Sequence, residues 1–207
     1  MPTEPRRGRF LVLEGGDGVG KSTQVAAVAE RLAKTGLVVK RTREPGGTEL
    51  GERIRSLLAG DHDIDPSAEA LLMAAARAQH CAQVIGPALA RGEWVLSDRF
   101  DGSFYAYQGY GRGIPLPQLE ALNDFAVGGV RPDLTILLSN GLSGAHRGLD
   151  GSDRFEGMGA DFQTRVEEGY LALAARHGWE VVDSHGSRAE VTDRILAAIE
   201  RGLGAPR

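Results

Sequence analysis

The sequence has little cysteine, few aromatic residues and no excess of positive charge. Its 207 residues include one cysteine, Cys81, so neither a disulfide framework nor a cysteine-based zinc site can be built, which favours a reducing cytoplasm. The formal net charge of −4 argues against a partner such as duplex nucleic acid, so any phosphate chemistry must use local arginines. No apolar run is long enough for a membrane span or a secretory core, and neither membrane insertion nor export is indicated.

Short apolar runs alternate with segments of helical periodicity along the chain. The length and the hydrophobic content of 42% fit one domain over residues 1–207. Strands are predicted at 10–13, from 37 onwards, and at 94–96, 134–138 and 179–182, and helices at 21–34, 50–58, 66–91, 161–176 and 188–201. Ile54, Leu57 and Leu58 are expected to face inward, and the 66–91 helix is expected to break near Gly86-Pro87. This alternation predicts an α/β fold with a five-stranded parallel sheet covered by helices on both faces.

A phosphate-binding loop follows the first predicted strand. Its residues match the pattern G-x-x-x-x-G-K-[ST], between a strand and a helix, and they are Gly15, Gly16, Asp17, Gly18, Val19, Gly20, Lys21 and Ser22. Backbone N–H groups of such a loop surround phosphate oxygens, and Lys21 adds a mobile positive charge. The Ser22 hydroxyl is the expected Mg²⁺ ligand, while Thr23, assigned to the same loop, is expected mainly to pack. The motif predicts binding of a nucleoside triphosphate with Mg²⁺.

The residues after the third strand narrow the class of phosphate-loop protein. The chain contains no Asn/Thr-Lys-x-Asp tetrapeptide, which disfavours a regulatory GTPase. Motor and transporter ATPases usually carry Asp-Glu at the end of an apolar strand, whereas this chain carries Asp98-Arg99. A metal-directed carboxylate beside a cation suggests that a second phosphate is held next to the metal ion.

Four further motifs resemble the thymidylate kinase family. They are Thr42-Arg-Glu-Pro-Gly-Gly-Thr48, Arg77-Ala-Gln-His80, Asp98-Arg-Phe100 and Ala106-Tyr-Gln-Gly109. Their order and spacing also match the family, and the resemblance covers nearly the whole chain, from Arg9 to Arg201. The resemblance implies the three-layer P-loop fold of nucleoside monophosphate kinases, ATP-dependent phosphorylation of dTMP to dTDP, Mg²⁺ as cofactor and a homodimer.

The resemblance also implies roles for individual residues. Arg55 and Arg99 should grip the acceptor monophosphate, because guanidinium groups offer forked donors to phosphate oxygens. Asp17 should face the acceptor sugar. Metal ligation is assigned to Ser22 and Asp98, and less directly to Glu44 through bound water. The remaining residues assigned to the acceptor site are Pro45, Met73, Arg77 (pyrimidine edge), Ser103, Phe104, Tyr107 (deoxyribose) and Gln108.

The phosphate loop contains no arginine, so by the same resemblance a flexible lid over ATP should supply one. The polar, glycine-rich stretch at 140–159 is the expected lid, although its composition alone fits an ordinary surface loop slightly better. Arg154, in Asp153-Arg-Phe-Glu156, is the first candidate for the catalytic arginine and Arg147 the second.

The sequence departs from the family pattern in the base pocket and at the lid. Met73 stands where the family carries a stacking phenylalanine, and Phe104 stands where it carries a small polar residue. The exit of the fourth strand reads Leu138-Ser139-Asn140 in place of Leu-Asp-Val, and the run to Arg154 is about one helical turn shorter. Two alternatives therefore stay open: a kinase of another pyrimidine monophosphate, and a nucleotide-binding protein without turnover.

Overall fold

A five-stranded parallel sheet forms the centre of the computed structural model, which describes residues 7–60, 63–141 and 158–204. The strands are β1 (Phe10–Glu14), β2 (Val39–Arg43), β3 (Trp94–Asp98), β4 (Leu134–Ser139) and β5 (Glu180–Asp183), in the spatial order β2-β3-β1-β4-β5. The α-helices are α1 (Lys21–Ala33), α2 (Glu49–Ala59), α3 (Pro66–His80), α4 (Gly86–Ala90), α5 (Asp101–Phe104), α6 (Leu116–Val127), α7 (Ala160–His177) and α8 (Arg188–Leu203). The predicted fold class is confirmed.

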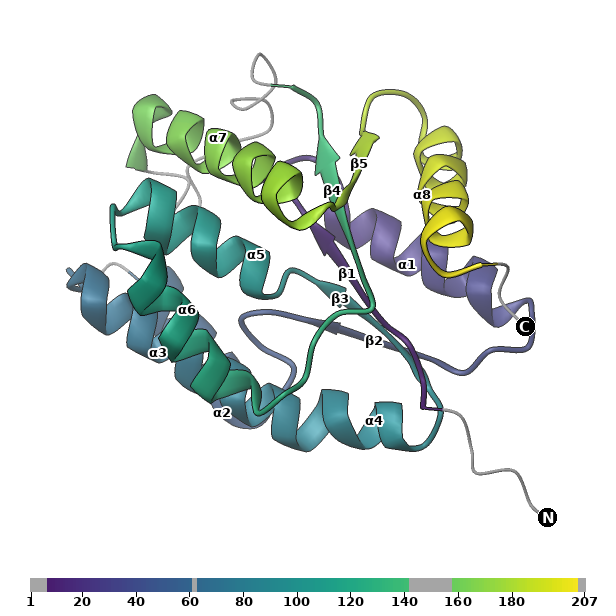
Figure 1. Ribbon diagram of the computed structural model, residues 1–207, viewed down its shortest axis with the longest axis horizontal. Coiled ribbons are helices and arrows are strands. Elements are labelled where there is room, and N and C mark those ends of the chain that lie inside the picture. Colours follow the sequence, from purple (N-terminus) through teal and green to yellow (C-terminus); the bar gives the residue numbers. More distant parts are fainter. Residues whose placement is uncertain (1–6, 61–62, 142–157, 205–207) are drawn as a thin grey trace.

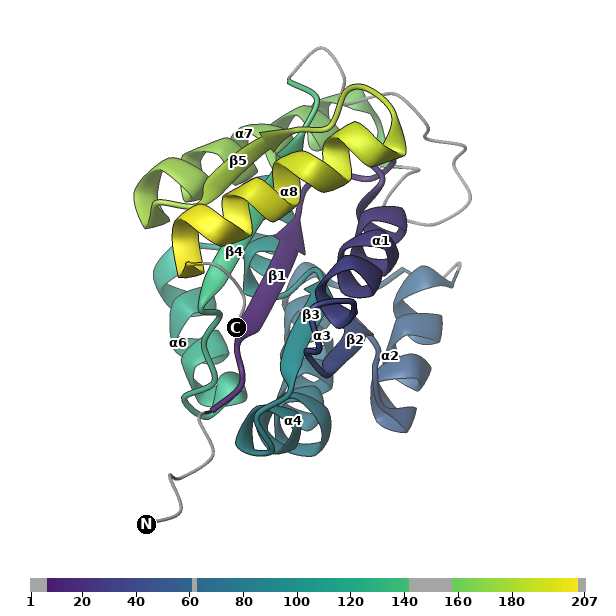
Figure 2. The same ribbon diagram turned by 90° about the vertical axis from the view of Figure 1, so that its right-hand side faces the viewer.

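The central strand β1 shows how the sheet is covered by two layers of helices. All five residues of β1 are buried, and successive side chains point to opposite faces. Leu11 and Leu13 pack in a cluster with residues of α1 and α8, whereas Phe10 and Val12 pack in a cluster with residues of α4. Figure 2 shows α1 and α8 in front of the strands, and Figure 1 shows α2 to α7 gathered on the other side.

The helix predicted over 66–91 is interrupted, as expected, and the interruption is a π-helical turn. Residues Cys81–Ile85 form a π-helical turn in which the Gly86 N–H donates to the Cys81 carbonyl, five residues earlier. Pro87 at the start of α4 has no N–H to continue an α-helical ladder, so the wider turn absorbs the irregularity. A second π-helical segment, Tyr105–Gly111, follows α5 directly and carries part of the functional site.

Three details of the sequence prediction need correction. Leu57 does not face inward: it is 43% exposed, whereas Ile54 and Leu58 on the same helix are buried. Strand β2 begins at Val39 and not at Leu37, because Val38 lies 66% exposed ahead of the pairing with β3. Strand β5 runs from Glu180 to Asp183, one residue later than predicted.

Parallel pairing brings the carboxyl ends of the strands to one edge of the sheet. Leu13, in the penultimate position of β1, lies beside Asp98 at the end of β3, and Asp98 lies beside Arg43 at the end of β2. In open α/β sheets this edge is where ligands bind. None of the helices in the described ranges is long and apolar enough to cross a membrane.

Candidate functional site

The loop between β1 and α1 has the backbone of an anion-binding cradle. Gly15 and Gly20 have positive φ angles of 141° and 89°, which residues with a side chain rarely adopt. A Cβ atom on Gly15 would lie 2.3 Å from the Leu138 carbonyl oxygen, so only glycine allows β1 to leave the sheet this close to β4. Val19 is buried in the core and anchors the loop, which leaves the N-terminus of α1 directed at the cradle.

Lys21 lies folded against the loop that it is predicted to serve. Its Nζ atom donates to the Gly16 carbonyl oxygen at 2.5 Å, and the residue is 6% exposed. Burial, together with the positive charge of Arg99, lowers the pKa of Lys21 to about 8, although nearby carboxylates oppose the shift. An incoming phosphate would offer this ammonium group a stronger partner than a backbone carbonyl.

Two of the three predicted metal ligands lie together. Ser22 Oγ donates to Asp98 Oδ2 at 2.5 Å, in a groove beside the basic strand β2. Two hard oxygen donors next to a phosphate-binding loop match the ligands that a protein contributes to a Mg²⁺ site, since the ion takes its other ligands from phosphates and water. Within the described residues, no group of three His, Cys, Asp or Glu side chains could hold a metal ion. Thr23 is exposed, so the expectation that it packs was wrong.

Glu44, the third predicted metal ligand, has both carboxylate oxygens engaged elsewhere. Arg77 Nε donates to Oε2 at 2.8 Å, and His80 Nδ1 lies 2.9 Å from Oε1. The residue is 4% exposed and lines a second cavity, described below, and not the groove that holds Ser22 and Asp98. The structure therefore does not bring Glu44 together with the other two predicted ligands.

Arg99 joins the phosphate loop to a second cavity. Its backbone has a φ angle of 70°, a conformation in which a residue with a side chain is strained. Nη1 donates to the Gly15 carbonyl oxygen at 2.8 Å and to the Tyr170 hydroxyl at 2.7 Å, and Nη2 donates to Asp17 Oδ1. The Asp98-Arg99 pair thus places a carboxylate towards the metal groove and a guanidinium towards the cavity.

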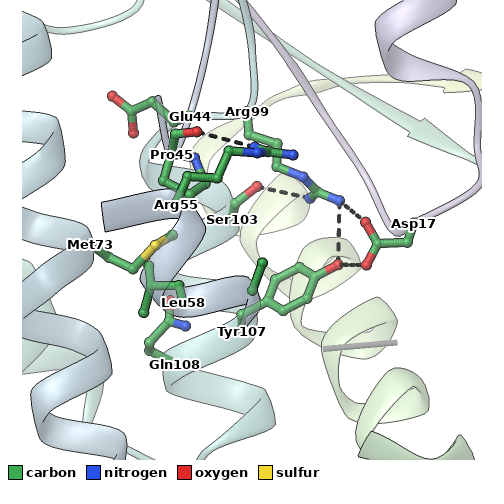
Figure 3. Close-up of a pocket in the computed structure, with 11 residues that line it drawn as sticks. Asp17, Glu44, Pro45, Arg55, Leu58, Met73, Arg99, Ser103, Tyr107 and Gln108 are labelled. Carbon is green, nitrogen blue, oxygen red and sulfur yellow. Dashed lines mark hydrogen bonds and ion pairs between the residues drawn. The ribbon is translucent and has the colours of Figure 1, made fainter. Parts of the chain in front are cut away.

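Asp17 belongs to the phosphate loop and also lines the second cavity, where Arg99 and Tyr107 both donate to its carboxylate. Burial alone would raise its pKa, but Arg99, Lys21 and a 2.6 Å hydrogen bond from the Tyr107 hydroxyl together lower the pKa below its ordinary value of 3.8. The carboxylate is therefore ionised at neutral pH, and its oxygens point towards the Arg99 guanidinium and the Tyr107 hydroxyl (Figure 3).

The second cavity is polar at one end and largely apolar at the other (Figure 3). Arg55 and Arg99 lie with Asp17 at the polar end, and Arg55 Nη1 is held by the Pro45 carbonyl oxygen at 3.1 Å. Leu58 and Met73 lie at the other end, beside the amide of Gln108. The lining residues are Asp17, Glu44, Pro45, Arg55, Leu58, Ala59, Met73, Arg99, Ser103, Tyr107 and Gln108. Such a cavity suits an anion joined to a ring.

Two residues predicted for the base pocket are not in the cavity lining. Arg77 is 1% exposed, and its three nitrogens donate to Glu44, to Asn123 Oδ1 and to the Phe100 carbonyl oxygen. Phe104 is fully buried, with its ring 5.1 Å from the Arg77 guanidinium. Phe104 therefore offers no face to a ligand here, which corrects its assignment to the acceptor site.

Several residues that the sequence did not single out complete the site. Glu14 ends β1 and accepts hydrogen bonds from the Phe100 and Ser103 N–H groups and from the Ser103 hydroxyl, so it holds the segment after Arg99. The sequence could have singled out Glu14, because it is a carboxylate at the end of an otherwise apolar strand. No local sequence signal marks Tyr170, because it reaches Arg99 from α7, 71 residues away along the chain.

The two predicted lid arginines, Arg147 and Arg154, lie outside the described residues, as does most of the 140–159 segment. Their assignment remains a prediction.

Comparisons with known proteins bear on the whole of this site. A family model described as thymidylate kinase matches residues 13–195. The chain is 51% identical over 200 residues to a thymidylate kinase of Methylococcus capsulatus, covering 95% of this chain and 93% of that protein. A thymidylate kinase of Pelotomaculum thermopropionicum is 47% identical, with 96% of both chains covered. The crystal structure of thymidylate kinase from Ehrlichia chaffeensis superposes with a TM-score of 0.78 at 30% identity, covering 93% of this chain and 99% of that one. With its fold, its phosphate loop and these relatives, the chain belongs to the thymidylate kinase family.

Proposed function

We propose that this protein transfers the γ-phosphoryl group of ATP to dTMP, yielding ADP and dTDP for DNA precursor synthesis. The observation that carries the proposal is the position of Arg99, whose guanidinium touches both the phosphate loop and the floor of the acceptor cavity. Two anion sites that share one side chain are close enough to present a donor and an acceptor to each other. The family to which the chain belongs supports this reaction.

The phosphate loop would hold the donor. Its backbone N–H groups and Lys21 would bind the β and γ phosphates, and Ser22 with Asp98 would hold Mg²⁺. The Mg²⁺ ion, when bound, neutralises part of the charge that is spread over the transferring phosphoryl group. Release of Lys21 from the Gly16 carbonyl oxygen would accompany phosphate binding.

The second cavity would hold the acceptor. Arg55 and Arg99 would bind the monophosphate, an oxygen of which attacks the γ phosphorus as the bond from that phosphorus to the bridging oxygen of ADP breaks. Asp17, held by Arg99 and Tyr107, would orient the sugar and keep Arg99 in place. Aligning two anions in this way is most of what phosphoryl transfer requires of a protein. Arg154, or else Arg147, would supply the further charge from the lid.

The base would occupy the apolar end of the cavity. Met73 and Leu58 offer the apolar walls, and the ring of Tyr107 would lie against the deoxyribose. Because Arg77 has buried partners on every nitrogen, its predicted contact with the pyrimidine edge would have to use its remaining N–H groups.

The function is tested by ADP release from ATP with a panel of deoxyribonucleoside and ribonucleoside monophosphates. We expect the highest kcat/KM with dTMP, and we expect Lys21→Ala and Arg154→Ala to lower kcat strongly, because both remove charge from the transition state. Faster turnover of another monophosphate would replace dTMP as the substrate. An absence of turnover with every acceptor would leave a nucleotide-binding protein that has lost the reaction.

We further propose a cytoplasmic homodimer built from a single catalytic domain over residues 1–207. Helices α2, α3 and α6 pack side by side (Figure 1), and each carries an exposed apolar residue: Leu57 is 43%, Leu71 58% and Phe125 88% exposed. These exposed apolar residues on neighbouring helices support cover by a second copy. Cys81 is buried, which raises the pKa of its thiol to about 12 and suits a reducing compartment. Light scattering of the protein and of Phe125→Asp tests the dimer.

A further inference from the structure

Gln108 presents a buried oxygen atom that has no hydrogen-bond partner in the part of the chain that the structure describes. The residue is 1% exposed and lines the apolar end of the acceptor cavity, near Leu58 and Met73 (Figure 3). Its Nε2 atom donates to Glu69 Oε1 at 2.9 Å, while Oε1 makes no bond. Buried polar atoms are nearly always paired, so an unpaired acceptor in a cavity wall indicates a ligand that donates to it.

Glu69 determines which end of the Gln108 amide is left without a hydrogen-bond partner in the cavity wall. The carboxylate is fully buried in the first turn of α3 and receives Arg112 Nε at 3.2 Å and Arg112 Nη2 at 2.7 Å. An ionised carboxylate accepts hydrogen bonds and donates none. Rotating the Gln108 amide by half a turn would place its oxygen against the Glu69 oxygen, and both residues are too buried for bulk solvent to screen the repulsion. The amide is therefore held with Nε2 on Glu69 and with Oε1 unpaired.

We propose that Glu69 is a positioning residue for base selection, which it controls by holding Gln108 as a hydrogen-bond acceptor. The inference rests on the proposed function, since it takes the apolar end of the cavity as the place of the base. Thymine and uracil carry an N–H at ring position 3, whereas cytosine carries a lone pair there. A fixed acceptor favours the N–H of thymine or uracil and repels the lone pair of cytosine. This selection compensates for the small polar residue that is replaced by Phe104.

A purely structural role for the same cluster predicts something different. The Glu69–Arg112 ion pair also joins α3 to the π-helical segment, so its loss would destabilise the fold and affect every acceptor alike. A positioning role changes the ratio between acceptors. The ratio of kcat/KM for dTMP to kcat/KM for dCMP is therefore the decisive readout, and the ratio of their dissociation constants, from calorimetry without ATP, measures the same selection without turnover.

The experiment compares the wild type with Glu69→Gln and Arg112→Gln. In Glu69→Gln the new amide can donate as well as accept, so the Gln108 amide can rotate by half a turn. We expect the ratio of kcat/KM for dTMP to kcat/KM for dCMP to fall about tenfold. The fall should come from a higher KM for dTMP, with kcat nearly unchanged. Arg112→Gln is the matched control: it removes the ion pair but leaves the Glu69 carboxylate to receive Gln108. We expect it to lower the melting temperature and to keep the ratio.

The outcomes separate the two proposals. A wild-type ratio in Glu69→Gln, or an equal fall in Arg112→Gln, overturns the positioning role while the proposed function stands. A wild type that turns over no monophosphate overturns the proposed function, and the calorimetric ratio then still tests Glu69. A wild type that binds dTMP no better than dCMP overturns the positioning role directly.

Discussion

Replacing Arg77 by leucine should lower the free energy of unfolding by about 3–5 kcal/mol, the usual cost of leaving one charge of a buried pair without its partner. Arg77 and Glu44 are 0% and 4% exposed in their side chains, so water cannot replace the lost contact. The guanidinium also lies between the rings of Phe100 and Phe104, at 5.2 and 5.1 Å, and its loss removes both contacts. The position is a structural support of the site, whatever its role towards the base.

The assay is thermal and urea denaturation monitored by circular dichroism. For a chain of this size each kcal/mol lowers the melting temperature by about 2–4 °C, so Arg77→Leu should lower it by roughly 6–20 °C. Arg53→Leu is the control, since it breaks the ion pair with Glu49, whose two side chains are 76% and 83% exposed, and should leave the melting temperature almost unchanged. The double variant Arg77→Leu/Glu44→Gln should recover part of the loss, because it removes the uncompensated charge. Equal effects of Arg77→Leu and Arg53→Leu would refute the reasoning.

Three further predictions concern the site itself. Tyr107→Phe should keep the preference for deoxyribose because the ring remains, whereas Tyr107→Ala should reduce that preference about tenfold or more. The measurement is the ratio of kcat/KM for dTMP to kcat/KM for the corresponding ribonucleotide. Equal ratios in the two variants would contradict the role of the ring. Because the pKa of Asp17 lies below its ordinary 3.8, its ionised form stabilises the fold above that pH, and the contribution is lost as the pH falls through the folded-state value. The difference in melting temperature between the wild type and Asp17→Asn should therefore shrink at acid pH; a constant difference would count against the network. Ser22→Ala should raise the Mg²⁺ concentration for half-maximal rate about tenfold or more, and an unchanged Mg²⁺ titration would remove Ser22 from the metal site.

Local signals in the sequence were enough for the architecture and for the donor side. Five short apolar runs between helical segments predicted the parallel sheet, and the predicted bounds differ from those of the observed strands by no more than two residues. The phosphate loop was readable because all of its residues are contiguous and its glycines are demanded by backbone conformation. The motifs after β2 and β3 likewise identified the family, which the comparisons confirmed.

Only the tertiary structure decided which polar groups are free and which are used. Arg77 and Phe104 sit in recognisable motifs, yet each Arg77 nitrogen already donates to Glu44, Asn123 or a backbone carbonyl, and Phe104 is fully buried against the guanidinium. Gln108 is the opposite case: its Oε1 atom is unpaired because its Nε2 atom is held by Glu69, 39 residues away. A sequence names the donors and acceptors, but their pairing is settled by contacts between distant segments, and the groups left unpaired in a cavity are those that can meet a ligand.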